Sequence, residues 1–300
     1  MLHEILFALL GKVGTVIIEA DGYFRVNPSL EFISTPEAIL IEKLVVLGTY
    51  YNKLRQILQE DKKSFNDNIL NYNRKEEEKQ FVLSSIGNSA YVRAVCDGIH
   101  LFIVEYEKTV LEIEQDYLKD KIFTFSNLSV KLSKFYSIFP EACLMFERVD
   151  EESIKGGQLI DFLYQCSLNG NVNIKSMYSM LLNKCYSVLY NQTMLWILHG
   201  KLFDKFDEYF IYKLVNTGSN QENSDGATKD VYNEFEQEEW DGIFSMRYSM
   251  LPKLLITEKT AEKILFIGKS VRVLLASSEI SPAESEEIFT EEIIQVIKEA

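Results

Sequence analysis

The sequence predicts an all-α protein of stacked helical bundles, with a small N-terminal β-hairpin and a disordered acidic insertion. Apolar residues recur at steps of three and four over most of the 300 residues, which is the period of an amphipathic helix. Short stretches with Gly, Pro or Asn separate these periodic segments. Residues 216–241 lack the period and are rich in Asn, Ser, Gly and acidic side chains. We therefore expect six or more packed helices and one mobile insertion.

The composition is that of a soluble globular protein with an acidic balance. Hydrophobic residues make up 47% and charged residues 25%, and 31 basic against 45 acidic residues give a net charge of -14. No Lys- and Arg-rich block offsets this charge. Because phosphate backbones and anionic lipid attract basic surfaces, we expect protein partners, no nucleic acid and no membrane.

The opening residues MLHEILFALLGKVG are expected to form the first helix and not a secretory signal. Their apolar run is short, follows Glu4 and ends at Gly11-Lys12 without a cleavage pattern. No later run approaches the roughly 18 apolar residues that a membrane span requires. The chain is therefore expected to lie inside the cell.

The hairpin is predicted in TVIIEADGYFRV, with Asp21-Gly22 at its turn. Ser34-Thr35-Pro36-Glu37 then supplies a helix start. The helix that follows carries an apolar stripe, formed by Leu40, Leu44, Leu47, Tyr51, Leu54 and Leu58. Such a stripe requires another helix to cover it.

A polar segment, residues 61–80, is predicted to be a solvated loop before a second long helix. That helix carries one apolar face, formed by Val92, Val95, Ile99, Phe102, Tyr106, Val110, Ile113 and Tyr117. Further helices are expected at 128–139, 141–149, 158–166 and 172–198, separated by Phe139-Pro140, Gly156-Gly157 and Asn169-Gly170. Two more are expected after the insertion, in EKTAEKILFIGKSVRVLL and in the residues that lead to Ala300.

The stretch YNQTMLWILHGKLFDKFDEYFIYK places reactive-looking residues close together: Trp196, His199, Gly200, Asp204 and Glu208. His199, Asp204 and Glu208 could in principle make a metal site with three ligands. We favour a structural interpretation, in which Gly200 ends a long helix by adopting a positive φ. The two acids are then expected on a solvated face.

Other chemical motifs are incomplete, so we expect no catalytic, metal-binding or cofactor-binding residues. The histidines His3, His100 and His199 are too far apart in sequence for a helical metal pair. Gly268-Lys269-Ser270 resembles the end of a phosphate-binding loop, but Lys263 stands where that loop needs Gly. No GxSxG motif is present. The widely spaced cysteines, Cys96, Cys143, Cys166 and Cys185, are expected to be buried reduced thiols.

Three segments resemble the gamma-tubulin complex proteins in the order that this family has them. The first grip motif of the family is matched by Trp196, Gly200, Leu202, Asp204 and the run Glu208-Tyr209-Phe210-Ile211. Tyr209 stands where the family often has Phe. Further matches are the segment from Tyr91 to Asp120 and a later group of residues, Leu251, Pro252, Ala261, Ile264, Leu265 and Gly268. The resemblance extends over residues 1–300.

The resemblance implies a scaffold and no cofactor. Members of this family align side by side through their helical N-terminal halves and hold gamma-tubulin on their C-terminal halves, so that a ring of tubulins templates microtubule nucleation. They act at microtubule minus ends, at centrosomes and spindle poles. This chain is expected to end before the second grip motif and to lack the gamma-tubulin-binding domain. It would therefore supply lateral assembly with other complex components, while gamma-tubulin would bind through the full-length protein.

Two other classes of function remain open. A helical tethering or transport adaptor would show the same helical periodicity, and an enzyme would need a reactive site. The ordered set Trp196, Gly200, Asp204 and Glu208 argues against the adaptor. The incomplete nucleotide and metal motifs argue against the enzyme.

Overall fold

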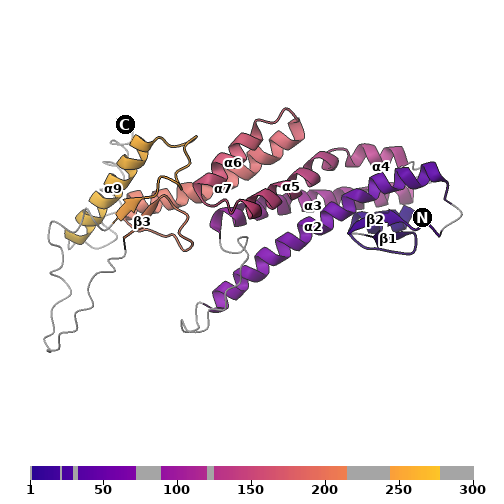
Figure 1. Cartoon of the computed structure of the whole chain (residues 1–300), viewed down its shortest axis with the longest axis horizontal. Coiled ribbons are helices and arrows are strands. Elements are labelled where there is room, and N and C mark those ends of the chain that lie inside the picture. The colour runs from indigo at the N-terminus through magenta and orange to yellow at the C-terminus, as the bar shows by residue number, and fades with distance from the viewer. Residues whose placement is uncertain are drawn as a thin grey trace. The chain divides into compact units, whose positions relative to one another are not determined.

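The computed structural model describes residues 2–20, 22–29, 33–71, 89–119, 125–214 and 244–277. Helices predominate in these residues, which confirms the predicted fold class (Figure 1). The chain divides into two compact units. The first unit comprises Met1–Lys155 and Phe162–Cys185, and the second comprises Gly156–Asp161 and Tyr186–Ala300.

The first unit begins with the expected helix and hairpin. Helix α1 spans Leu2–Leu9 and is followed by β1, Ile17–Ala20, and β2, Tyr23–Val26. The strands pair antiparallel, with Ile17 opposite Val26 and Ala20 opposite Tyr23. Gly22 has a φ of 75°, a conformation that glycine adopts without strain. The predicted hairpin is therefore confirmed.

Helix α2, Thr35–Asn71, begins where the sequence predicts. The backbone N–H and the hydroxyl of Ser34 both donate to Oε2 of Glu37, at 3.2 and 2.8 Å, which resembles a capping box. The predicted apolar stripe is buried except for Leu40, which is 51% exposed. Ile41 is buried in its place, because it lies three residues before Leu44 on the same face.

The predicted loop at 61–80 is wrong for its first part, since α2 continues to Asn71. Residues 61–71 are mostly polar but contain neither Gly nor Pro, so nothing in them breaks a helix that has already formed. Asp61 is moreover buried, and this burial raises the pKa of its carboxyl group. Residues 72–80 lie outside the described residues.

Three further helices of the first unit follow: α3, Ala90–Lys119, α4, Phe125–Leu132, and α5, Phe135–Glu151. The predicted break at Phe139-Pro140 is wrong, because Pro140 lies inside α5 and the chain turns earlier, between α4 and α5. Proline costs the helix one hydrogen bond. The apolar face of α5 is buried on both sides of Pro140, at Ile138 and Ala142, and this packing outweighs the loss.

Tyr106 of α3 lies at the centre of the first core, where α2 packs against α1, α3 and α5. Its ring contacts those of Tyr51, Phe135 and Phe139, with centroid distances of 5.6, 5.1 and 4.9 Å. Its hydroxyl donates to the carbonyl oxygen of Leu9 at 3.0 Å, so the buried polar atom is satisfied. Helices that are distant in sequence are thereby held together.

Helices α6, Gly157–Ser167, and α7, Val172–His199, each have residues in both units. The second unit also contains β3, Ile211–Lys213, β4, Phe244–Met246, and α9, Glu258–Ser277. Strands β3 and β4 pair antiparallel, a second small sheet that the sequence does not predict. The predicted insertion at 216–241 and the predicted last helix lie outside the described residues.

Candidate functional site

The family-motif residues converge in the second unit, where the end of α7, residues 200–211, β4 and α9 meet. We call this place the motif junction. Trp196 on the last turns of α7 is fully buried. Its indole Nε1 donates to the carbonyl oxygen of Ile264 on α9 at 2.9 Å, and its ring meets that of Phe244 edge-on at a centroid distance of 4.9 Å. The indole thus joins α7 to both α9 and β4.

Gly268 provides the space for this indole. It is buried on α9, and a Cβ atom at this position would overlap Nε1 and Cε2 of Trp196. Ser270 follows two residues later, and its hydroxyl donates to the carbonyl oxygen of Phe266 at 2.9 Å within the same helix. Gly268-Lys269-Ser270 is therefore one turn of a packed helix and does not form a phosphate-binding loop.

Gly200 ends α7 as the sequence predicts. Its φ is 58°, and its N–H donates to the carbonyl oxygen of Trp196 at 3.0 Å, which is the bond of an αL helix cap. A Cβ at Gly200 would press against Cβ and the backbone of Arg272 on α9. Glycine is therefore required here for both its conformation and its size.

Asp204 organises the segment that follows. Its Oδ2 accepts the N–H of Tyr209 at 2.8 Å. The hydroxyl of Tyr209 donates in turn to Oγ1 of Thr193 on α7 at 3.1 Å. Tyr209, Phe210 and Ile211 are all buried, and the carbonyl oxygen of Phe210 accepts the N–H of Arg247 at 2.7 Å. Asp204 therefore orients the chain as it enters β3.

The prediction that both acids lie on a solvated face is wrong for Glu208. This residue is 1% exposed, whereas Asp204 is partly exposed. Acids four residues apart share a face of a regular helix or strand, but the chain between Gly200 and Glu208 is neither, so this spacing does not place the two acids on one face. Gly156, at a φ of 55°, also brings its backbone against the carbonyl group of Glu208.

The remaining motif residues divide between core and partly exposed positions. Leu251, Pro252 and Ala261 are buried, while Leu202, Ile264 and Leu265 are partly exposed. Asp161 on α6, which sequence reasoning missed, accepts the N–H groups of Lys253 and Leu254 at 2.9 and 3.2 Å. No local pattern could have revealed this contact, because its partners are about 92 residues apart along the chain.

The junction does not assemble a reactive site from its polar residues. Within the described residues, no three His, Cys, Asp or Glu side chains lie close enough to hold a metal ion together. His199, Asp204 and Glu208 are therefore not brought together as ligands. The indole, the two glycines and the Asp204 carboxylate instead hold backbone segments in place, which is a structural role.

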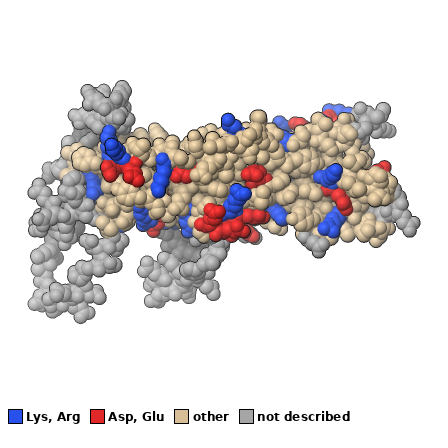
Figure 2. Space-filling model, turned by 45° about the horizontal axis from the view of Figure 1, so that its top comes forward, with Lys and Arg blue, Asp and Glu red and all other residues tan. Residues whose placement is uncertain are grey.

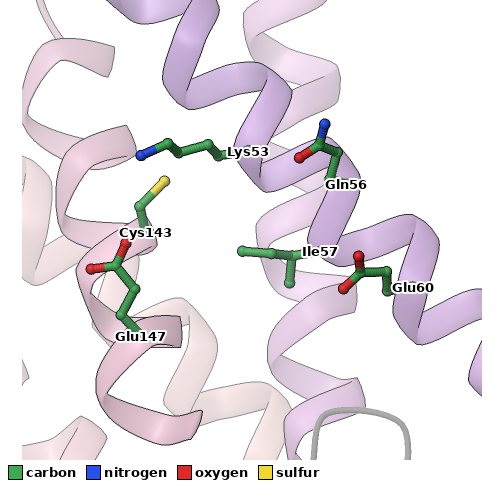
Figure 3. Close-up of a pocket in the computed structure, with 6 residues that line it drawn as sticks. All are labelled: Lys53, Gln56, Ile57, Glu60, Cys143 and Glu147. Carbon is green, nitrogen blue, oxygen red and sulfur yellow. The ribbon is translucent and has the colours of Figure 1, made fainter. Parts of the chain in front are cut away.

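A shallow pocket in the first unit is another place that could bind a small molecule. It is lined by Lys53, Gln56, Ile57 and Glu60 of α2 and by Cys143 and Glu147 of α5 (Figure 3). Burial raises the pKa of the Cys143 thiol to about 12, although the nearby Lys53 ammonium opposes this shift. Because the thiolate is the reactive form, this cysteine is a poor nucleophile. Burial likewise raises the pKa of Cys96 and Cys166.

The charges on the surface and the lengths of the helices bear on contact with nucleic acid and with membranes. On the face shown in Figure 2, basic and acidic side chains are interspersed and no continuous basic area is seen. Every helix in the described part of the chain is too short or too polar to cross a bilayer. Direct contact with phosphate backbones is thus not favoured on this face.

Comparisons with known proteins point to one family. The family model described as "Gamma tubulin complex component N-terminal" matches residues 2–300. The gamma-tubulin complex component 4 homolog of Medicago truncatula is 30% identical over 292 residues, which is 91% of this chain and 38% of that relative. Gamma-tubulin complex component 4 of Homo sapiens is 27% identical over 297 residues, which is 91% of this chain and 43% of that relative.

A more distant relative carries a different component name. Gamma-tubulin complex component 3 of Drosophila melanogaster is 28% identical over 120 residues, which is 40% of this chain and 11% of that relative. The chain spans about two fifths of the length of the component 4 relatives that it matches. The similarity to those two relatives therefore concerns both units of this chain and only part of each relative.

Proposed function

Because this chain belongs to the gamma-tubulin complex component N-terminal family, we propose that it is a non-catalytic scaffold subunit of the gamma-tubulin complex. It assembles laterally with other complex components through its helical surface. In the full-length protein, gamma-tubulin is held in the same row. Such a row templates microtubule nucleation at a microtubule-organising centre, and it acts at microtubule minus ends.

The observation that carries this proposal is that the grip-motif residues are engaged in packing and hydrogen bonds within the protein. Trp196, Gly200 and Gly268 are buried; the indole lies against Gly268 of α9 and Gly200 lies against Arg272 of α9, while the Asp204 carboxylate accepts a backbone N–H. Residues in these positions pack within the fold and are not exposed to a substrate. A family motif that maintains a rigid helical body is consistent with a scaffold.

The physical advantage of a scaffold is effective concentration. Nucleation of a microtubule requires several tubulin molecules to meet in one arrangement, and such an encounter is rare in solution. Subunits fixed side by side convert later binding steps into events at high local concentration. Lateral contacts that repeat head to tail build rings or helices, which is the geometry that a template needs.

A helical tethering or transport adaptor is the second candidate. Long amphipathic helices would serve it equally well, but the family assignment covers residues 2–300 and gives it no support. An enzyme is a weaker candidate still, since the motif junction and the α2–α5 pocket offer neither a metal-ligand set within the described residues nor an activated thiol.

Affinity purification of the tagged chain from cell extract tests this function. We expect gamma-tubulin complex components to co-purify in amounts comparable to the bait. A matched control is the Gly268→Arg variant, in which the bulky side chain disrupts the motif junction. Recovery of adaptor partners without any complex component, from a bait shown to be folded by circular dichroism, would refute the proposal.

A further inference from the structure

Helix α3 carries a second apolar stripe in addition to the one that faces the core. Its core face includes Ile99, Phe102 and Tyr106, all of which are buried. The other stripe is exposed: Leu101 by 49%, Val104 by 47%, Leu111 by 51% and Leu118 by 67%. Single exposed apolar residues are common on protein surfaces, but four on one face of one helix need an explanation.

The exposed stripe has the spacing of a coiled coil. With Lys108 and Gln115 included, the positions advance in alternating steps of three and four residues, from Leu101 to Leu118. At 1.5 Å per residue this surface is about 25 Å long. We call it the α3 seam, defined by Leu101, Val104, Lys108, Leu111, Gln115 and Leu118. One helix of a partner has the right shape to cover it.

Acidic side chains border the α3 seam on both sides. In coiled-coil terms the flanking positions are occupied by Glu105 and Glu112 on one side and by Glu107 and Glu114 on the other. The side chains of Glu105, Glu112 and Glu114 are 49%, 58% and 41% exposed. They face Lys134, Lys108 and His3 at 2.7, 4.0 and 3.9 Å, respectively. Glu107 is partly exposed and its Oε1 accepts the hydroxyl of Tyr51 at 2.6 Å, so the edges carry three exposed carboxylates and one that is held by α2.

This charge selects the kind of helix that can bind. Flanking charges decide partner choice in coiled coils, because opposite charges attract across the seam and like charges repel. A second copy of α3 would bring glutamates against glutamates. A helix with Lys or Arg at its flanking positions would complement them. Lys108 and Gln115, which interrupt the apolar residues, would also restrict the register of such a helix.

We propose that the α3 seam is the docking surface for one amphipathic helix of another protein, whose apolar stripe is bordered by Lys and Arg. The inference depends on α3 and its surroundings in the first unit. It does not depend on the proposed scaffold function, so either can fail without the other.

A pair of synthetic helical peptides tests the proposal with the whole chain. Both carry Leu and Val at the core positions over about four heptads, and they differ only in Lys or Glu at the flanking positions. Fluorescence anisotropy is expected to show the Lys peptide binding roughly tenfold or more tightly than the Glu peptide. Added salt is expected to reduce this preference, because exposed charges are screened.

Substitutions in the seam locate the binding site. The double variant Val104→Asp and Leu111→Asp is expected to weaken binding of the Lys peptide by roughly tenfold or more, since it places charges in the apolar contact. Val130→Asp on α4, where Val130 is 72% exposed, is the matched control and should leave binding unchanged. If the double variant fails to fold, Leu111→Gln alone is expected to weaken binding of the Lys peptide as well. Glu112→Lys is expected to shift the preference toward the Glu peptide.

Several results would overturn the inference. The two peptides could bind equally, the Lys peptide could fail to bind, or the folded seam variants could bind as tightly as the unaltered chain. Sedimentation velocity adds a further check: self-association that is lost in Leu111→Gln would identify a second copy as the occupant instead.

Discussion

Trp196 and Gly268 illustrate, at the scale of single residues, how a sequence motif can encode packing. The indole of Trp196 occupies the place where any side chain on residue 268 of α9 would lie. Its Nε1–H donates a hydrogen bond to the carbonyl oxygen of Ile264 on the same helix, α9. The indole thus explains why residue 268 is a glycine. Trp196 stands beside His199 and Asp204 in the sequence, yet its contacts are with α9 and β4.

Replacing Trp196 by Ala is expected to destabilise the second unit. Loss of a fully buried aromatic side chain typically lowers the free energy of unfolding by about 3–5 kcal/mol. Urea denaturation followed by circular dichroism measures the change. Phe203→Ala is the control, because Phe203 is 72% exposed and its loss should change stability by no more than about 0.5 kcal/mol. An unchanged midpoint for Trp196→Ala together with lost partner binding would make this residue an interface anchor instead.

Replacing Gly268 by Ala tests the contact between this residue and the Trp196 indole. The expected change in stability is opposite in sign to the usual effect of this substitution in a helix. In an exposed helix, alanine is more stable than glycine by about 1 kcal/mol. Here the added methyl group would overlap the indole, so we expect a lower unfolding midpoint. Gly170→Ala, where a Cβ meets nothing within 4 Å, should not be destabilising. A stabilised Gly268→Ala variant would show that the indole does not lie against α9.

Replacing Asp204 is expected to change the free energy of unfolding less than replacing Trp196, because only one hydrogen bond is lost. Asp204→Ala removes the acceptor for the N–H of Tyr209 and should lower the free energy of unfolding by about 1 kcal/mol. Asp204→Asn keeps an acceptor oxygen of the same shape, so it should cost less. Thermal unfolding of the two variants compares them. Divalent metal bound stoichiometrically by the unaltered chain, and lost in Asp204→Asn, would contradict the structural role.

At the scale of elements, local sequence patterns correctly predicted those turns and helix ends that a few adjacent residues determine. The hairpin, the start of α2 and the end of α7 each follow from a few adjacent residues with defined turn or cap chemistry, such as the left-handed conformation of Gly200. Pro140 inside α5 was mispredicted because tertiary packing overrode a local breaker. The contact of Asp161 with residues 253 and 254 depends on the fold alone.

Glu4 joins α1 to the hairpin and makes this contact sensitive to pH. The backbone N–H of Val16 donates to Oε2 at 2.7 Å, and the hydroxyl of Thr15 donates to Oε1 at 2.9 Å. These two bonds, the first being the larger effect, lower the pKa of the Glu4 carboxyl in the folded protein. A group with a lowered folded pKa stabilises the fold above its unfolded pKa, and this contribution is lost as the pH falls through the folded value.

Glu4→Gln is therefore expected to reduce stability near neutral pH and to matter less in acid. The difference in free energy of unfolding between the unaltered chain and the variant should shrink as the pH falls below about 4.3, the pKa of an unperturbed glutamate. Denaturant titrations at several pH values measure this difference. A difference that stays constant across the acid range would show that the Glu4 carboxylate does not hold the hairpin.

At the scale of the whole molecule, the sequence predicted fold class better than the position of individual side chains. Helical period alone identified the long helices, because burial of one face repeats every three or four residues. The burial of Glu208 and the second small sheet depend on segments that meet only after folding. The family-motif residues were found as a set, but the contacts of Trp196, Gly200, Asp204 and Gly268 in the motif junction required the structure.

The central claim is that this chain assembles laterally with other components of the gamma-tubulin complex. Sedimentation velocity of the purified chain, mixed with the N-terminal region of another component at micromolar concentrations, tests it most directly. We predict a heavier species of fixed stoichiometry that is absent when either protein is measured alone. Two folded proteins that sediment independently at every concentration and ratio would contradict the account.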